Sequence, residues 1–423
     1  MASSTIAIPN LYRSTLANGI TLIVVENQAA DIISGRFFLK GAGTIVEQPE
    51  QAGLAHLVSA VITKGTKNLS ALEIAEKIES IGAGLGTDAS SDYFSLSLKT
   101  VSADFAPMLN LLGEIMRSPT FPESEVELER KLTLQGIKSQ KEQPFNVAFN
   151  QLRQQMYPQH PYGISVLGTE DSVKNLTRED LQNYHQTYFR PDNLVISLSG
   201  RIAPAQAEDL ITETFGDWSN PTQPLPAKSL TAPTYNPSQQ EIIQDTQQSI
   251  VMLGYLGSKV NLEDYPVLKL ISTYLGSGLS SRLFVELREK RGLAYDVSAF
   301  FPTRLNTAPF ITYMGTAPTN TEIAIEGLST EVERLTQVTL SDDELQGAKN
   351  KLLGQYALGK QTNGEIAQTY GWYETLGLGV EFDRTFQDTI PPITAERVRE
   401  VAQKYLTQPY ISIVKPNQST VNS

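Results

Sequence analysis

The feature that most constrains the fold of this chain is an internal repeat on either side of a proline-rich segment. The stretch 219–240, SNPTQPLPAKSLTAPTYNPSQQ, has no hydrophobic periodicity and is typical of a linker. Before it, the pattern from Ser70 to Gly82 aligns with the pattern from Ser280 to Gly292 at a constant offset of 210 residues. The motif FPESE at Phe121 likewise resembles LSDDE at Leu340. Two such matches in the same order predict a duplicated domain.

The repeat predicts a first domain at 1–220, a linker at 219–240 and a second domain at 241–423. The expected strands are 19–25, 32–40, 91–98, 194–200, 309–315 and 410–414, with further strands within 242–256. The expected helices are 53–66, 70–81, 104–116, 123–143, 177–189, 204–215, 265–275, 281–291, 319–336, 342–356 and 395–405. Strands and helices do not alternate one for one. We therefore expect an α+β fold of two homologous two-layer domains, each a mixed, mainly antiparallel sheet with helices on one face.

Composition excludes several classes of function. The net charge of −12 argues against nucleic acid or an anionic membrane as the main partner. The chain has no cysteine, so disulfides, cysteine-based zinc sites and cysteine nucleophiles are excluded. The N-terminus lacks a basic segment followed by an apolar run, and the sequence holds no apolar run of about 18 residues. We therefore expect a cytoplasmic protein without a membrane span.

The stretch 53–66, GLAHLVSAVITKGT, is the best candidate for a functional helix. His56, Ser59 and Ala60 lie at positions i, i+3 and i+4, so they share one face of this helix. That spacing is the one in which an H-x-x-E-H motif presents two zinc ligands and a general base. Here the glutamate and the second histidine are absent. His56 alone is therefore expected to be a partly buried residue with a satisfied hydrogen bond rather than a metal ligand, and the same holds for His160 and His185, which have no partner at ligand spacing.

Several long motifs resemble one known family. GLAHLVSAVITKGT is followed in order by SALEIAEKIESIGAGLGTDASSDYFSLSL, FPESEVELERK, HPYGISVLGTEDSVKNL, YHQTYFRPDNLVISLSG and GSGLSSRLFVELREKRGLAY. Together, over roughly residues 12–415, these are similar to the pitrilysin or insulinase zinc peptidases, which include the mitochondrial processing peptidase subunits and their bacterial homologues. The resemblance implies two similar domains, which together form half of a clam-shell chamber. It also implies a peptidase built from two such chains or from one chain of double length.

The resemblance also implies where a zinc site would be. The family's first histidine is His56, its general-base position is Ser59 and its second histidine position is Ala60. The family's distal ligand, a glutamate 76 residues beyond the second histidine, falls on Gly136, whereas the glutamate seven residues earlier is retained as Glu129. With one of three ligands left and no base, we expect no metal and no cofactor in this chain.

The second half carries a different part of the family pattern. Arg288 and Tyr295, seven residues apart in REKRGLAY, match an arginine–tyrosine pair that in relatives contacts the bound peptide near its scissile carbonyl. Both side chains can donate hydrogen bonds to an oxygen that gains negative charge. The alternative is that Arg288 belongs to a solvated basic face with Lys290 and Arg291, while Tyr295 packs in the core.

The resemblance implies a non-catalytic subunit of a heterodimeric, processing-peptidase-like zinc metallopeptidase. A homologous partner with an intact H-x-x-E-H motif would hold the zinc, and Arg288 and Tyr295 would contact the peptide in trans. Without such a partner, a homodimer is the alternative assembly. An inert scaffold or peptide-binding homologue is the alternative function. Residues 88–98 are either an edge strand that pairs with an extended peptide, as in relatives, or an ordinary core strand.

Overall fold

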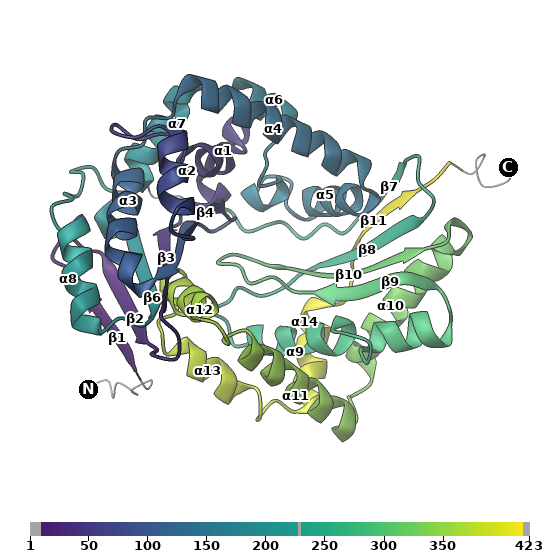
Figure 1. The fold of residues 1–423 in the computed structure, drawn as a ribbon. Coiled ribbons are helices and arrows are strands. Elements are labelled where there is room, and N and C mark those ends of the chain that lie inside the picture. The colour runs from purple at the N-terminus through teal and green to yellow at the C-terminus, as the bar shows by residue number, and fades with distance from the viewer. Residues whose placement is uncertain (1–9, 227–229, 418–423) are drawn as a thin grey trace. The chain divides into compact units, whose positions relative to one another are not determined.

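A computed structural model describes residues 10–226 and 230–417, so three residues of the expected linker, 227–229, lie outside the described residues, as do 1–9 and 418–423. The chain forms two compact units. The first comprises 1–137, 165–229 and 357–383, and the second comprises 138–164, 230–356 and 384–423. Each unit is built on one mixed sheet with helices on its faces, which confirms the expected α+β class with mainly antiparallel sheets (Figure 1).

The first unit holds a six-stranded sheet in the order β1-β2-β6-β3-β5-β4. Its strands are β1 (Leu11–Thr15), β2 (Thr21–Glu26), β3 (Ile32–Lys40), β4 (Gly84–Ala89), β5 (Tyr93–Val101) and β6 (Leu194–Gly200). Its helices are α1 (Leu54–Val61), α2 (Ala71–Glu79), α3 (Phe105–Arg117), most of α4 (Glu123–Glu142), α6 (Glu170–Asn175), α7 (Arg178–Tyr188), α8 (Pro204–Phe215) and α12 (Asn363–Thr375). Only the β2–β6 pair is parallel.

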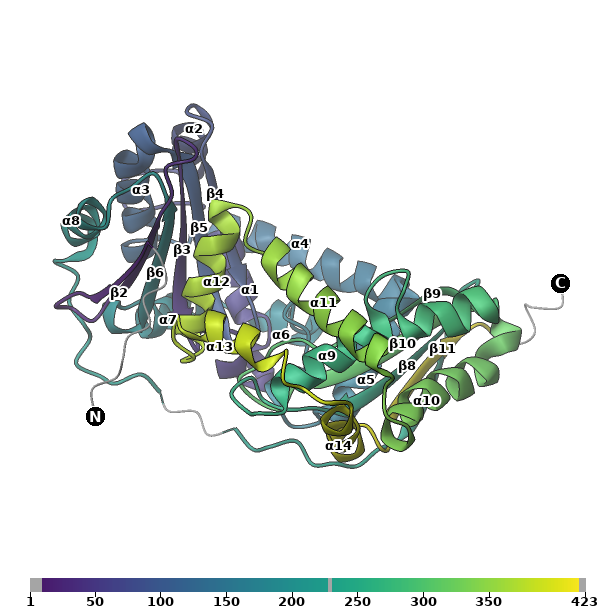
Figure 2. The same ribbon diagram turned by 90° about the horizontal axis from the view of Figure 1, so that it is seen from below.

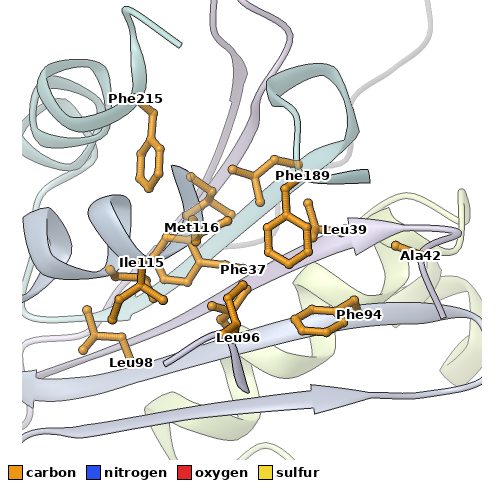
Figure 3. Close-up of a cluster of buried hydrophobic side chains, with 14 of the residues drawn as sticks. Phe37, Leu39, Ala42, Phe94, Leu96, Leu98, Ile115, Met116, Phe189 and Phe215 are labelled. Atoms are coloured by element: carbon orange, nitrogen blue, oxygen red, sulfur yellow. The ribbon is translucent and has the colours of Figure 1, made fainter. Parts of the chain in front are cut away.

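The main core of the first unit lies between one face of its sheet and the helices α1, α3, α7 and α8. Alternate residues of the strands point into it, among them Phe37, Leu39, Leu96 and Leu98. Figure 3 shows these side chains meeting Met116 and other apolar residues of the covering layer. Burial of this one face follows from the period-two alternation of β5, in which every second residue is apolar.

The second unit holds a five-stranded sheet in the order β7-β11-β8-β10-β9. Its strands are β7 (Gln239–Ile243), β8 (Ser249–Leu256), β9 (Ala294–Phe300), β10 (Pro309–Thr316) and β11 (Tyr410–Lys415). Its helices are α5 (Pro144–Met156), α9 (Tyr265–Gly276), a π-helix (Phe284–Lys290), α10 (Thr321–Gln337), most of α11 (Asp342–Leu358), α14 (Ala395–Tyr405) and most of α13 (Phe382–Thr389). Figure 1 shows α5 on one side of these strands and α9, α10 and α14 on the other.

The two sheets have the same topology. Strands β2, β3, β4, β5 and β6 correspond in chain order to β7, β8, β9, β10 and β11, and both sets lie in the same spatial order. The parallel pair is β2–β6 in one sheet and β7–β11 in the other. This correspondence confirms the duplication expected from the repeated motifs, with β1 as an addition to the first copy.

The units are not the two halves of the sequence, because each half gives one segment to the other unit. Residues 138–164 belong to the second unit and residues 357–383 to the first. Both segments are 27 residues long and lie 219 residues apart, which is also the spacing of the FPESE and LSDDE motifs. Helix α5 packs on β8 and β11, and helix α12 packs on β3 and β6. The units therefore depart from the expected bounds of 1–220 and 241–423 at these two equivalent segments.

Each exchanged helix lies on the sheet face opposite the main helical layer. Both faces of each sheet therefore carry a helix, and the expectation of helices on one face only is wrong. In Figure 2, α12 lies on the other side of β3 and β6 from α3 and α8. A glycine allows the close approach in both units. A methyl group on Gly371 of α12 would come within 2.5 Å of the Phe38 ring, and one on Gly254 of β8 would come within 2.6 Å of the sulfur of Met156.

Among the described residues, none of the helices is long and apolar enough to cross a membrane. Of the two alternatives for residues 88–98, the core strand is right for β5 and the edge strand is not. Strand β5 pairs with β3 on one side and β4 on the other, and β4 forms the edge of the sheet. Strand β4 was not predicted, because its sequence GLGTDA is rich in glycine. Glycine weakens a strand and leaves no alternating pattern, so these residues resemble a turn.

Candidate functional site

Helix α1 presents the expected face. It begins after Gly53, whose φ of +93° lies in the left-handed region. The buried carboxylate of Glu47 accepts hydrogen bonds from the backbone N–H groups of Gly53 and Ala55, at 2.9 and 2.7 Å, and so satisfies the helix N-terminus. His56, Ser59 and Ala60 are brought together on this helix as their spacing predicted.

The side chains at these positions cannot replace the missing zinc ligands. Ser59 Oγ donates a hydrogen bond to the carbonyl oxygen of His56 at 2.7 Å, so the hydroxyl is used within the helix. Ala60 has no polar atom, and Gly136 on α4 has no side chain. A methyl group on Gly136 would meet only a Leu167 side chain, at 3.6 Å, so space remains beside this glycine.

The retained glutamate is paired with a lysine. Glu129 on α4 forms an ion pair with Lys64 at 3.0 Å. The ring of His56 has no hydrogen bond to a described residue, so the expectation of a satisfied hydrogen bond is wrong. Burial lowers the pKa of His56, and the charges of Asp88 and Glu129 partly oppose this shift. The imidazole is therefore a neutral group near two carboxylates.

These residues do not fit zinc. Structural zinc sites use four protein ligands and catalytic sites use three with a water. Within 10–226 and 230–417, no group of three histidine, cysteine, aspartate or glutamate side chains could hold a metal ion. One imidazole, a serine committed to its own helix and a glycine leave no donor set.

The other two histidines have structural roles, as their sequence context predicted. His160 is buried, and its Nδ1 accepts a hydrogen bond from the Tyr162 N–H at 3.1 Å. His185 packs between the rings of Phe121 and Phe189, and its Nε2 lies 2.7 Å from the carbonyl oxygen of Met116. Burial lowers the pKa of His185 to about 4. The His185 ring is therefore neutral at neutral pH.

Arg288 lies in the π-helix of the second unit, where an α-helix was expected over 281–291. π-helical turns are rare and frequently occur at functional sites. The Arg288 guanidinium is exposed and lies over the Phe284 ring at 5.1 Å. The turn closes where the carbonyl oxygen of Arg288 accepts a hydrogen bond from Gly292, whose φ is +62°. The Arg288 side chain therefore extends from a π-helical turn that is irregular but held by backbone hydrogen bonds.

Tyr295 lies at a β-bulge of β9, the edge strand of the second sheet. Asp296 pairs with Gly315 and Ala294 pairs with Thr316, so Tyr295 has no partner across the strand pair. A bulge redirects a side chain, and bulges are frequent beside active sites. The Tyr295 side chain is 60% exposed, so the alternative that it packs in the core is wrong. The sequence alone did not predict this β-bulge.

Comparisons with known proteins identify the family of this chain. A family model described as Insulinase (Peptidase family M16) matches residues 23–170, and one described as Peptidase M16 inactive domain matches residues 175–352. The chain belongs to peptidase family M16. An uncharacterized zinc protease of Bacillus subtilis is 26% identical over 409 residues, which cover 96% of this chain and 98% of the relative. A second one, from Streptomyces coelicolor, is 26% identical over 421 residues, which cover 97% and 90%.

Solved structures show the same fold. A peptidase M16 inactive domain from Pseudomonas fluorescens superposes with a TM-score of 0.88 at 26% identity, covering 96% of this chain and 98% of that one. A protease from Helicobacter pylori gives a TM-score of 0.92 at 22% identity, covering 97% and 100%. The M16 fold therefore extends over nearly the whole chain, including the segments that the two halves exchange.

Proposed function

We propose that this chain is the non-catalytic subunit of a heterodimeric, processing-peptidase-like zinc peptidase, to which it contributes Arg288 and Tyr295. The observation that carries the proposal is a contrast within the chain. The family's metal positions hold groups that cannot bind zinc, whereas Arg288 and Tyr295 are exposed at a π-helical turn and a β-bulge. Two local irregularities that each expose a polar group favour a functional role over an ordinary solvated surface.

The chemistry of the pair suits a peptide bond under attack. A guanidinium offers several N–H donors in a fixed plane, and a phenol offers one O–H donor. Both can donate to a carbonyl oxygen that becomes negative in the transition state, which lowers the barrier if they are held in place beforehand. Neither group can activate water, so the nucleophile and the metal must come from another chain.

The partner would be a homologous M16 chain with an intact H-x-x-E-H motif and its distal glutamate. Relatives named zinc proteases support the reaction class. The substrate would be a peptide or an unfolded segment, bound in extended form.

Reconstitution tests the proposal. The chain is mixed with the H-x-x-E-H homologue from the same organism, and cleavage of fluorogenic peptides is measured for the mixture and for each chain alone. The expected result is turnover by the mixture only. Arg288→Gln and Tyr295→Phe are each expected to lower kcat by on the order of 10²-fold, the effect of removing one preorganised donor to the reacting oxygen.

Matched substitutions separate this role from general damage. Arg291→Gln removes a neighbouring exposed guanidinium, and Tyr235→Phe removes a hydroxyl from another exposed tyrosine. Both controls are expected to leave kcat within twofold. Equal losses in the controls, or unchanged turnover in the Arg288 and Tyr295 variants with the complex intact on gel filtration, would remove the pair from catalysis.

A peptide-binding scaffold is the second candidate, favoured by the sheet edges. β4 pairs only with β5, and β9 pairs only with β10, so each sheet ends in a strand with one unpaired edge among the described residues. Extended peptides bind such edges by strand addition. Peptide binding by the chain alone, together with failure of every M16 homologue to gain activity from it, would select the scaffold.

A further inference from the structure

The sheet of the first unit has a polar face opposite its main core. Residues Ser34, Arg36, Ser95, Ser97, Ser197 and Ser199 alternate with core residues on β3, β5 and β6, and we call them the serine face. Arg36 lies at its centre, directly paired with Ser97 on one side and Ser197 on the other. Serines on both neighbouring strands leave room around a long side chain, because their own side chains are short.

Arg36 has no counter-charge. No ion pair or hydrogen bond joins its guanidinium to another residue of the described chain, and its Nε is buried without a partner. The Ser197 hydroxyl, on the residue directly opposite, is fully buried and also has no partner. Arg36 is partly buried, and buried donors in folded proteins are nearly always hydrogen-bonded. Its unpartnered guanidinium therefore indicates a missing acceptor.

The surroundings fit an acceptor from outside the chain. Helix α12 covers the β6 side, where a methyl group on Gly371 would come within 2.8 Å of Ser197 Cβ. On the β4 side the residue in line with Ser97 is Gly86, which has no side chain. The acid that β4 contributes to this face, Asp88, pairs with Ser95 and lies two strands from Arg36. The chain has 46 acidic and 34 basic residues, yet within the part that the structure describes no carboxylate is among the groups that influence the pKa of this arginine.

The electrostatics point the same way. Burial lowers the pKa of Arg36, and the nearby Tyr93 hydroxyl only partly opposes this. An arginine stays protonated under such conditions, so it retains its charge and its fork of N–H donors. That fork matches the two oxygens of a carboxylate.

We propose that the Arg36 guanidinium binds a carboxylate of a bound peptide. The carboxylate is either the peptide's C-terminus or the side chain of an aspartate or glutamate. The inference relies on the proposed function for the class of ligand, a peptide, and adds that this chain selects acidic peptides. It assigns to the first unit a substrate contact that does not involve Arg288, Tyr295 or a metal.

Binding to the isolated full-length chain tests this without any turnover. Three fluorescently labelled peptides of one sequence are compared by anisotropy: one with a free C-terminus and a glutamate, one with a C-terminal amide, and one with glutamine in place of the glutamate. We expect the wild type to lose about tenfold in affinity with one of the two neutralised peptides, as for loss of a charge-assisted hydrogen bond. The peptide that loses affinity identifies which carboxylate is bound.

Substitutions test whether Arg36 causes the preference for the acidic peptide. Arg36→Gln is expected to bind all three peptides with equal affinity, and Arg36→Lys to retain part of the preference. Arg201→Gln, which removes an exposed arginine of the same unit, is expected to keep the full preference. Thermal unfolding verifies that each variant is folded, and an unfolded Arg36→Gln protein is replaced by Arg36→Met in the comparison.

Three results would overturn the inference: no peptide binding by the wild type, equal binding of the acidic and neutralised peptides, or a preference that survives the loss of Arg36. The proposed function fails differently, through unchanged turnover of the reconstituted pair when Arg288 and Tyr295 are replaced. A chain that stimulates its partner but binds acidic and neutralised peptides equally would thus keep the subunit role and lose the carboxylate site.

Discussion

The turn between helix and edge strand occurs once in each unit, and its two copies have diverged. At the repeat's offset of 210 residues, Arg288 corresponds to Ile78 and Tyr295 to Leu85. Ile78 and Leu85 pack against the core of the first unit, on a regular α-helix and in a regular strand pair. Arg288 and Tyr295 are exposed on a π-helix and at a bulge. The glycine between them keeps its left-handed conformation in both copies, with φ of +64° at Gly82 and +62° at Gly292.

The difference between the two turns shows where residues of the second copy serve something other than stability. The first copy uses the two positions to bury apolar surface, which stabilises the unit. The second copy gives up that burial, breaks the regular helix and strand, and exposes two hydrogen-bond donors. Such a departure from regular packing is expected where function, and not stability, determines the residue.

The largest expected effect concerns the exchange of segments that the copies share. Fragments 1–220 and 241–423 each lack the helix that covers the second face of their sheet. We expect neither fragment alone to unfold cooperatively, whereas the two expressed together form a stable complex. Circular dichroism with urea titration measures this. A fragment that folds alone with a steep transition would show that the exchanged helices are dispensable.

Converting the second turn to the first is the next test. Arg288→Ile with Tyr295→Leu is expected to lower turnover of the reconstituted pair by at least 10²-fold, since both donors to the reacting oxygen are lost. Because both side chains are exposed, the free energy of unfolding should change by no more than about 0.5 kcal/mol. Parallel kinetic and urea measurements would expose a large loss of stability, which would instead make the two residues structural.

The glycines beneath the exchanged helices allow a third comparison. Gly371→Ala forces a methyl group against the Phe38 ring and Ser197, and is expected to destabilise the protein by about 2 kcal/mol through overpacking. Gly254→Ala meets the flexible ends of Met156 and Leu152, which can move aside, so a cost of about 1 kcal/mol or less is expected. Urea unfolding of both variants decides the order, and equal costs would contradict the difference.

The smallest effect is expected at the position where relatives bind metal. His56→Gln is expected to leave turnover of the pair within twofold, because the His56 ring has no zinc partners and no hydrogen bond to a described residue. Elemental analysis of the wild type should find zinc far below one atom per chain. A loss of activity in this variant, or stoichiometric zinc in the purified chain, would show that His56 takes part in metal binding or catalysis.

The sequence predicted the duplication, the class of fold and most of the regular elements, because these depend on local periodicity. The strand 32–40 and the capping box at Ser70 have the form that their residues indicate. The placement of His56, Ser59 and Ala60 on one helical face also followed from spacing alone. It was the identity of these residues, rather than their arrangement, that led to the expectation of no metal.

Features that depend on distant contacts were not predictable. Helices α5 and α12 were not expected, and nothing local to them shows that each packs on the sheet of the other half. The bulge at Tyr295 is a property of the β9–β10 pair, so the sequence of β9 alone does not contain it. Arg36 reads as an ordinary polar residue of an alternating strand, and only the pairing of β3 with β5 and β6 shows that its neighbours are serines.

The reciprocal exchange also sets the order in which the protein can be completed during synthesis. The second face of the first sheet is covered by residues 357–383, so β3 and β6 must wait until nearly the whole chain has left the ribosome. The second sheet has its helix α5 made early, but its interior strand β11 emerges later still. Neither sheet can therefore be completed before most of the chain has been made. Because contacts that are distant in sequence slow folding, the first unit, whose strands emerge earliest and wait longest, is a natural client for a chaperone.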